Sequence, residues 1–165
     1  MANYLQMSCT TYRTGPQVGV QSHTLKWVCL VESGGGRSSF KQKRKHKTLK
    51  LFIATVNVRT LKSQERLEEL EEELTQINWD ILGLSETRLL EEKCTILHSR
   101  HMFFQNNKDT NPHIGGIGIL VNKRIKHLVT KIIAISDRVI YIVVQISEGY
   151  TLQVIQIYAP ISNSR

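Results

Sequence analysis

The chain has 165 residues and three cysteines, which is enough length for one domain with its own core but offers no cysteine spacing typical of a disulfide framework. Its formal net charge of +8 lies mostly in residues 1–48, which hold eight Lys or Arg against one acidic residue, whereas residues 49–165 hold fourteen against thirteen. No apolar run reaches the roughly 20 residues that span a bilayer, and the N-terminus lacks the order of a signal peptide, so we expect an intracellular protein, nuclear or cytoplasmic, that is neither secreted nor bound to a membrane.

The first 48 residues show no feature of a folded domain. Residues 1–36 have no sustained apolar periodicity and end in a glycine-rich stretch, which a basic run follows. The cations of this run can bind nucleic-acid phosphates weakly or lie in a solvated linker, and the sequence leaves both open. We expect residues 1–48 to be a disordered or non-homologous basic leader. Its weak nucleic-acid contacts would be Lys41, Lys43, Arg44, Lys45 and Lys47.

A strand–helix–strand unit is predicted next. Residues 51–58 form a β-rich run that is apolar on both faces, which is typical of an interior strand. Ser63 can cap a helix with one apolar face and an opposite face rich in Glu. The apolar positions of this helix are Leu67, Leu70, Leu74 and Ile77. Residues 81–86 form a second apolar strand, and a short helix is predicted over residues 89–98.

Strands dominate the rest of the chain. We expect them over residues 102–105, 115–122, 128–135, 138–146 and 151–158. Turns of hairpin length join the last three of these strands. One parallel unit followed by antiparallel strands predicts the α/β class, with one mixed β-sheet and flanking helices.

Two polar side chains are expected at one edge of this sheet. A strand, a helix and a second strand of this length form a parallel crossover, so Asn57 and Glu86 end neighbouring strands at the edge where ligands of α/β sheets collect. A carboxylate after so apolar a strand needs a cation, which is either Mg²⁺ or the guanidinium of Arg59 or Arg88. The residues by themselves favour the ion pair. Tyr158 ends the last strand and either orients a phosphate or caps the core.

Four motifs occur in a fixed order along residues 46–163. Residues 55–61 read Thr-Val-Asn-Val-Arg-Thr-Leu, and residues 81–88 read Ile-Leu-Gly-Leu-Ser-Glu-Thr-Arg. Residues 115–123 read Gly-Gly-Ile-Gly-Ile-Leu-Val-Asn-Lys, and residues 154–160 read Val-Ile-Gln-Ile-Tyr-Ala-Pro. Together they resemble the endonuclease/exonuclease/phosphatase superfamily. The residues of these motifs are most similar to those of the endonuclease domain of non-LTR retrotransposon (endonuclease–reverse transcriptase) polyproteins and of the related craniofacial development protein 2-like proteins.

This resemblance implies that residues 49–165 are the first half of a DNase I-like domain, a partial four-layer α/β sandwich. Intact members hydrolyse nucleic-acid phosphodiesters with Mg²⁺. In this chain Asn57 would help to hold the metal and the attacking group, Glu86 would be a direct metal ligand, and Tyr158 would contact the scissile phosphate. The family pattern continues with Gly-Asp-x-Asn and Ser-Asp-His motifs, which supply the base and further ligands. We expect a truncated domain, because the sequence continues for only seven residues after Tyr158.

Two functions from different classes follow from these observations. The first is a retroelement-derived, magnesium-dependent endonuclease fragment that acts on DNA more readily than on RNA in its intact family. Alone it would bind Mg²⁺ weakly or not at all and would be inactive, because hydrolysis also needs a base and a clamp for the transition state. The second is a non-catalytic remnant that binds nucleic acid weakly through the basic leader. A sheet face left uncovered in such a fragment could also mediate self-association.

Overall fold

The protein is described here from a computed structural model, which covers residues 6–12, 24–31, 49–107, 115–147 and 150–159. The five basic residues of the leader lie outside these described ranges. The elements in chain order are β1 (Gln6–Tyr12), β2 (Thr24–Val31), β3 (Leu49–Asn57), α1 (Gln64–Leu74), β4 (Ile81–Ser85), β5 (Lys93–Ile96), β6 (Met102–Asn106), β7 (Ile117–Val121), the 3-10 turn η1 (Lys126–Leu128), β8 (Val129–Ser136), β9 (Val139–Ser147) and β10 (Tyr150–Ile157).

The strands form two sheets. The larger sheet has the order β1-β2-β3-β4-β7-β6-β5, and the smaller one has the order β10-β9-β8. Strands β3 and β4 are parallel, as the strand–helix–strand pattern predicts, and every other neighbouring pair is antiparallel. The α/β class and the mixed sheet are therefore confirmed. The last three strands differ from the single sheet expected, because they pair only with one another and form a second layer.

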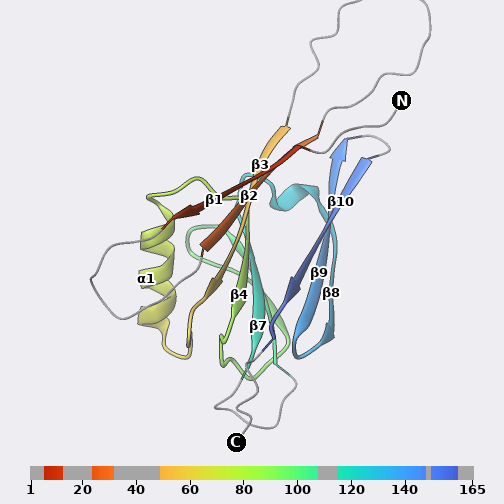
Figure 1. The fold of residues 1–165 in the computed structure, drawn as a ribbon. Helices are drawn as coiled ribbons and strands as arrows, with labels where there is room; N and C mark the ends of the chain where they lie inside the picture. The colour runs from red at the N-terminus through yellow and green to blue at the C-terminus, as the bar shows by residue number, and fades with distance from the viewer. Residues whose placement is uncertain (1–5, 13–23, 32–48, 108–114, 148–149, 160–165) are drawn as a thin grey trace, which may run out of the picture.

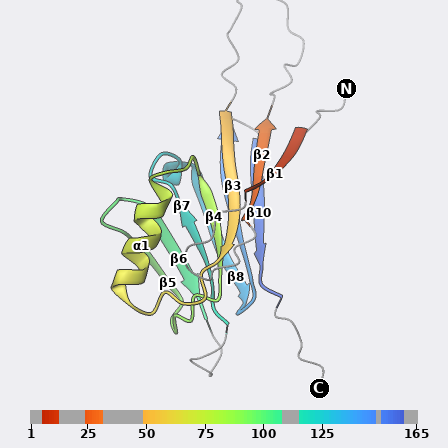
Figure 2. The ribbon, with the colours of Figure 1, turned by 60° about the vertical axis from the view of Figure 1, so that its left-hand side comes forward.

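Figure 1 shows three layers, with α1 on one face of the larger sheet and β8–β10 on the other, and Figure 2 shows the same order from a second side. Each interface has its own apolar core. Between the sheets, β4 and β7 contribute side chains that pack on Ile140, Ile142 and Val144 of β9. On the opposite face, Leu82, Leu84 and other side chains pack against α1. Strands β4 and β7 are thus buried on both faces, which explains their unbroken apolar sequences.

Helix α1 begins as the sequence predicts. Ser63 accepts a hydrogen bond from the backbone N–H of Arg66 through its hydroxyl, with a donor–acceptor distance of 3.4 Å. Leu67, Leu70 and Leu74 face the sheet. The helix ends at Leu74, however, and Ile77 is 49% exposed, so the prediction that Ile77 extends the apolar face was wrong.

The helix predicted over residues 89–98 is also wrong, because this segment contains the strand β5. Cys94 lies opposite Phe104 and Ile96 lies opposite Met102, so the segment completes the edge of the larger sheet. Local sequence preference is weak for so short a segment, and an available strand edge outweighs it.

Strands β1 and β2 lie in the segment for which we predicted a leader. They form an antiparallel pair, and β2 also pairs with β3. No periodicity in residues 1–36 predicted them. The boundary between a leader and a domain at residues 48 and 49 stays a prediction.

The smaller sheet exposes several apolar side chains to solvent. Ile135, Ile155 and Ile157 are 65%, 59% and 62% exposed, and they lie on β8 and β10. Single exposed apolar residues are ordinary, and these three lie on the two opposite edge strands of the sheet, with β9 between them. The self-association through a sheet face stays a prediction. Among the described residues, no helix is long and apolar enough to cross a membrane.

A histidine beside β6 predicts a pH dependence of stability. Nδ1 of His101 accepts a hydrogen bond from the backbone N–H of Lys123 at 3.0 Å, and its ring lies 4.7 Å from that of Trp79. Burial lowers the pKa of His101, Lys123 and Lys126 lower it further, and Glu71 opposes them. The unfolded chain therefore takes up this proton at a higher pH than the folded chain does.

The free energy of unfolding should accordingly be greatest above about pH 6.5 and should fall as the pH drops from there through the lower pKa of folded His101. Denaturant titrations across this range measure the effect. His101→Phe keeps a ring beside Trp79 and removes the titrating group, so its stability should depend less steeply on pH. An equal slope in both proteins would show that His101 does not cause it.

Candidate functional site

Asn57 and Glu86 meet at the carboxyl edge of the larger sheet. Asn57 is the last residue of β3, and it lies opposite Ser85 at the end of the parallel strand β4. The side chain of Asn57 donates from Nδ2 to Oε1 of Glu86 at 2.7 Å. Oδ1 of Asn57 accepts from the backbone N–H of Arg59 at 2.9 Å, which fixes the orientation of the amide. The proximity that the strand–helix–strand pattern predicts is confirmed.

The loop after β4 holds Glu86 in an uncommon backbone conformation. The φ angles of Glu86 and Arg88 are 58° and 55°, in the left-handed region that costs most residues about 1–2 kcal/mol. Two hydrogen bonds stabilise this loop, from Thr87 N–H to the carbonyl of Gly116 (3.2 Å) and from Arg88 N–H to the carbonyl of Gly115 (3.1 Å). The glycine-rich entry to β7 therefore supports the carboxylate of Glu86.

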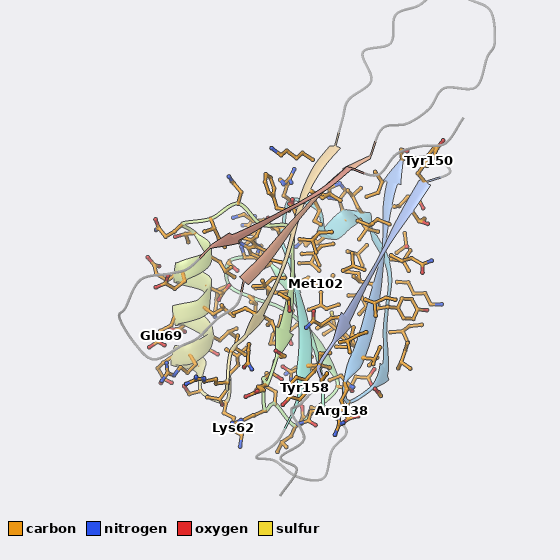
Figure 3. All side chains as sticks on the ribbon, viewed as in Figure 1. Lys62, Glu69, Met102, Arg138, Tyr150 and Tyr158 are labelled. Atoms are coloured by element: carbon orange, nitrogen blue, oxygen red, sulfur yellow. The ribbon has the colours of Figure 1, made fainter. Side chains whose placement is uncertain are left out.

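Tyr158 reaches the same place from the smaller sheet. It directly follows β10, its backbone N–H donates to the carbonyl of Arg138 at 2.9 Å, and its phenol lies close enough to Glu86 for that carboxylate to raise its pKa. Figure 3 shows Tyr158 and Arg138 together at the lower end of the two sheets. Burial raises the pKa of the Tyr158 phenol, and the carboxylate of Glu86 raises it further, whereas Arg138 and Arg88 oppose both. Three residues from separate segments thus form one cluster.

Cationic side chains border this cluster. Arg88 lies beside Glu86, with 3.9 Å between its guanidinium nitrogen and Oε2, so the ion pair that the residues alone favoured is present as a loose contact. The side chain of Glu86 is 25% exposed and keeps access to solvent. Arg138 pairs with Asp137 at 3.5 Å. The cluster therefore combines one carboxylate, one amide, one phenol and two guanidinium groups.

The donor set fits a weakly held Mg²⁺. This ion accepts one or two protein carboxylates and completes its six ligands with water and phosphate oxygens. Glu86 supplies one carboxylate, whereas Asn57 turns its amide nitrogen toward that carboxylate and its amide oxygen toward the backbone N–H of Arg59. Within the part of the chain that the structure describes, no three His, Cys, Asp or Glu side chains are grouped to hold a metal ion. The described residues therefore offer too few ligands for tight binding.

Sequence reasoning missed several residues that build this site. Arg138 follows the turn after β8, and Gly116 lies in the third motif. Their hydrogen-bond partners, Tyr158 and Thr87, are far away in the sequence, so no local pattern identified either residue as part of the site. Gln156 gives a weak signal, because it is polar at an inward position of β10 where its neighbours two residues away are Val154 and Tyr158. Thr87 is fully buried, and its hydroxyl has no hydrogen-bond partner among the described residues. Its burial cannot be read from the sequence.

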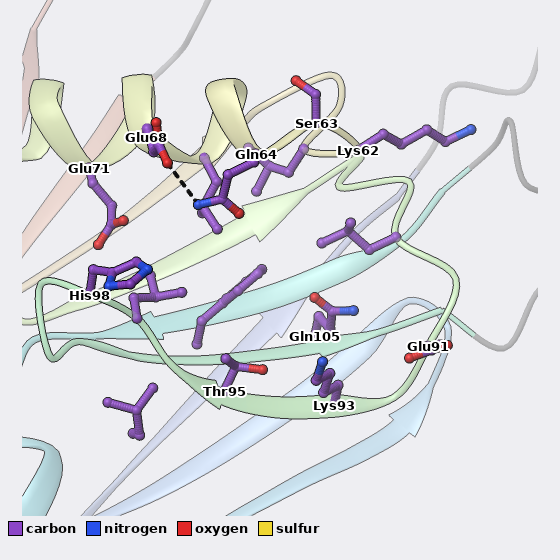
Figure 4. Close-up of a pocket in the computed structure, with 16 residues that line it drawn as sticks. Lys62, Ser63, Gln64, Glu68, Glu71, Glu91, Lys93, Thr95, His98 and Gln105 are labelled. Carbon is purple, nitrogen blue, oxygen red and sulfur yellow. Dashed lines mark hydrogen bonds between the residues drawn. The ribbon is translucent and has the colours of Figure 1, made fainter.

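A separate groove lies elsewhere on the molecule. A groove of about 590 Å³ runs between α1 and β5, with Glu68, Glu71, Lys93 and His98 along its walls, as Figure 4 shows. Asn57, Glu86 and Tyr158 do not line it. We place the candidate site at the sheet edge, because the converging charged and polar groups lie there.

The fold and the cluster define an α/β protein with a carboxylate, a carboxamide and a phenol at the carboxyl edge of a mixed sheet. No protein-family model matches the sequence. Over 108 residues, 66% of the chain, it is 29% identical to Craniofacial development protein 2 of cattle (Bos taurus). The matched region is 18% of that protein, so the chain spans about a fifth of its relative's length. This distant similarity agrees with part of the resemblance that the motifs carry.

Proposed function

We propose that residues 49–165 belong to a nuclease domain of the endonuclease/exonuclease/phosphatase type, and that their cluster binds Mg²⁺ together with a phosphate of DNA. One observation carries this proposal. Asn57 and Glu86 share a hydrogen bond of 2.7 Å, and the phenol of Tyr158 approaches the same carboxylate from the other sheet. These are the three residues that the four motifs assign to such a site.

Each residue has a role that its contacts support. Glu86 would be the anionic ligand of the metal, and Asn57 would orient this carboxylate through Nδ2. Tyr158 stays a neutral donor near neutral pH, because its pKa is raised, and a phenol O–H can donate to a phosphate oxygen. Arg88 and Arg138 add positive charge where a phosphate would lie. A bound Mg²⁺ would stabilise the negative charge of the phosphate.

The same contacts do not support hydrolysis by this chain alone. A water molecule that attacks phosphorus needs a base to accept its proton. Glu86 is the carboxylate of the cluster, and Asn57, Tyr158 and Arg88 already surround it with donors or positive charge. Because Glu86 would also be the anionic ligand of the metal, it would not be free to accept this proton. We propose that the chain binds metal and phosphate weakly and does not cleave DNA.

Metal binding tests the first half of this proposal. Mn²⁺ is a spectroscopic substitute for Mg²⁺, and electron paramagnetic resonance measures its free concentration directly. Glu86→Ala should weaken Mn²⁺ binding by about tenfold or more, because the anionic ligand is lost. Glu91→Ala is a matched control, since it removes an exposed carboxylate that lines the groove between α1 and β5. Equal Mn²⁺ affinities in the wild type and Glu86→Ala would refute the metal site.

Nicking of supercoiled plasmid in Mg²⁺ tests the second half. We expect no nicking by the wild type or by Glu86→Ala. Nicking by the wild type that disappears in Glu86→Ala would show that a complete catalytic site assembles, and the proposed inactivity would then be wrong. The other function, nucleic-acid binding through Lys41, Lys43, Arg44, Lys45 and Lys47, stays a prediction on which no described residue bears.

A further inference from the structure

Gln156 is a polar residue buried between the two sheets. It lies on β10, its side chain is 9% exposed, and it points inward with Val154 while Ile155 and Ile157 point outward. Its Oε1 accepts a hydrogen bond of 3.2 Å from the hydroxyl of Thr55 on β3. A buried side-chain amide retains its place in an apolar layer only when such a partner satisfies it.

The side chain of Gln156 also needs a glycine beneath it. Thr55 pairs with Gly83 in the parallel ladder of β3 and β4. A Cβ atom at Gly83 would collide with Oε1 and Cδ of Gln156, so the amide occupies the space that any other residue would fill. The contact therefore joins β3, β4 and β10 at one point.

This contact lies directly behind the candidate site. Thr55 precedes Asn57 by two residues, Gln156 precedes Tyr158 by two, and Gly83 precedes Glu86 by three. Each of the three strands therefore reaches the cluster two or three residues after the contact. A shift of β10 along or away from the larger sheet would thus carry Tyr158 away from Glu86.

Apolar packing does not fix this spacing by itself. A cavity of about 150 Å³ borders the contact, between residues of β3, β4, β7 and β10 that include Thr55, Gly83 and Gln156. Side chains beside a void lose contacts on that side, so packing resists small movements of the sheets less firmly there. The hydrogen bond between Thr55 and Gln156 crosses this weakly packed region.

We propose that Thr55 and Gln156 are positioning residues, whose hydrogen bond over Gly83 sets the position of Tyr158 on Glu86. This inference rests on the proposed function, in which Tyr158 contacts the phosphate and Glu86 binds the metal. It adds that the register between the two sheets determines the geometry of the site. The two polar residues would act on the site without touching metal or phosphate.

The test measures the contact between Tyr158 and Glu86 without metal. The protein is prepared with ¹³C-labelled tyrosine rings, and the Tyr158 signal is assigned by its loss in Tyr158→Phe. Its chemical-shift change on Glu86→Gln reports how closely the phenol approaches the carboxylate. We expect a clear change in the wild-type background. Thr55→Val, which removes only the hydroxyl, should lose most of this response, and Thr55→Ser should retain it.

A double variant separates positioning from simple stabilisation. Thr55→Val alone leaves the buried amide of Gln156 without its donor and should lower the melting temperature. Thr55→Val with Gln156→Met replaces both partners by apolar groups of similar volume, so the melting temperature should recover. The response of Tyr158 should remain lost. A response that recovers together with stability would overturn the proposal.

Two further outcomes would also overturn it. The first is a Tyr158 signal whose chemical shift does not change when Glu86→Gln is introduced into the wild type. The second is a folded Thr55→Val variant in which Glu86→Gln shifts the Tyr158 signal as much as in the wild type. Failure of the proposed function is seen separately, as unchanged Mn²⁺ binding in Glu86→Ala, because the tyrosine measurement contains no metal. The two ideas can therefore fail independently.

Discussion

Asp80→Ala should lower the free energy of unfolding by about 3 kcal/mol, because it removes a carboxylate with several charged hydrogen bonds at once. Asp80 is fully buried at the start of β4. It accepts from Nε and a terminal nitrogen of Arg124 at 2.9 and 2.6 Å and from the backbone N–H of Phe52 at 2.9 Å. The carboxylate thereby ties β3, β4 and the loop after β7 together. Denaturant titration measures the loss.

Two controls show which part of the interaction matters. Asp80→Asn keeps the shape and an acceptor oxygen but removes the charge, so it should cost about 1 kcal/mol less than Asp80→Ala. Arg124→Met completes a double-mutant cycle, and the coupling energy between the two side chains should be about 1 kcal/mol or more. Arg124 is half-exposed, which limits this coupling through solvent screening. A cost for Asp80→Ala within about 0.5 kcal/mol of zero would contradict the prediction.

This ion pair lies at the opposite end of β4 from Glu86. Asp80 precedes the strand, whereas Glu86 follows it. We therefore expect Asp80→Ala to destabilise the fold while its folded fraction keeps the contact between Asn57 and Glu86. A variant of this kind is a useful reference, because it separates loss of stability from damage to the site.

The sequence predicted the elements whose local pattern agrees with their final environment. The strand that ends at Asn57, the helix capped by Ser63 and the strand before Glu86 are all present. Apolar spacing, capping chemistry and segment length point to the same structure in this unit. The parallel pairing of β3 and β4 follows from the length of the connection and needs no knowledge of distant residues.

Elements that depend on distant partners were predicted less well. Residues 93–96 form β5 because the edge of β6 accepts them, and nothing within the segment itself indicates that edge. The hairpins of β8–β10 were expected, but their separation into a second sheet depends on which strands face β4 and β7. Alternation of apolar residues predicts that a strand has a buried face, but it does not name the layer that covers it.

The candidate site divides in the same way. Asn57 and Glu86 follow from topology, because they end neighbouring parallel strands. The role of Tyr158 at the site came from the resemblance to a family, since the residues alone left a phosphate contact and a capping role both open. Arg138 and Gln156 were not predicted, because each contacts residues far away in the sequence. What the sequence lacked was the register of one sheet upon the other, which is set by buried contacts between the layers.

Gly116→Ala should distort the site, at a cost of about 3 kcal/mol. Gly116 has a φ of 84°, which disfavours a side chain. A Cβ atom there would also lie 2.6 Å from the hydroxyl of Thr87 and 2.8 Å from the backbone nitrogen of Arg88. The loop that holds Glu86 must then move, and its carboxylate should leave Asn57. The side-chain amide signals of Asn57 in a ¹H–¹⁵N spectrum, assigned with Asn57→Ala, measure this directly.

Gly115→Ala is the matched control for that prediction. Gly115 has a similar φ of 78°, but a Cβ atom there would meet nothing within 4 Å. It should carry only the conformational cost, about 1–2 kcal/mol, and leave the Asn57 amide signals at their wild-type positions. If both variants shift the Asn57 signals equally, backbone strain at the entry of β7 is the cause. A shift confined to Gly116→Ala would instead show that close packing of β7 on residues 87 and 88 keeps the carboxylate of Glu86 in place.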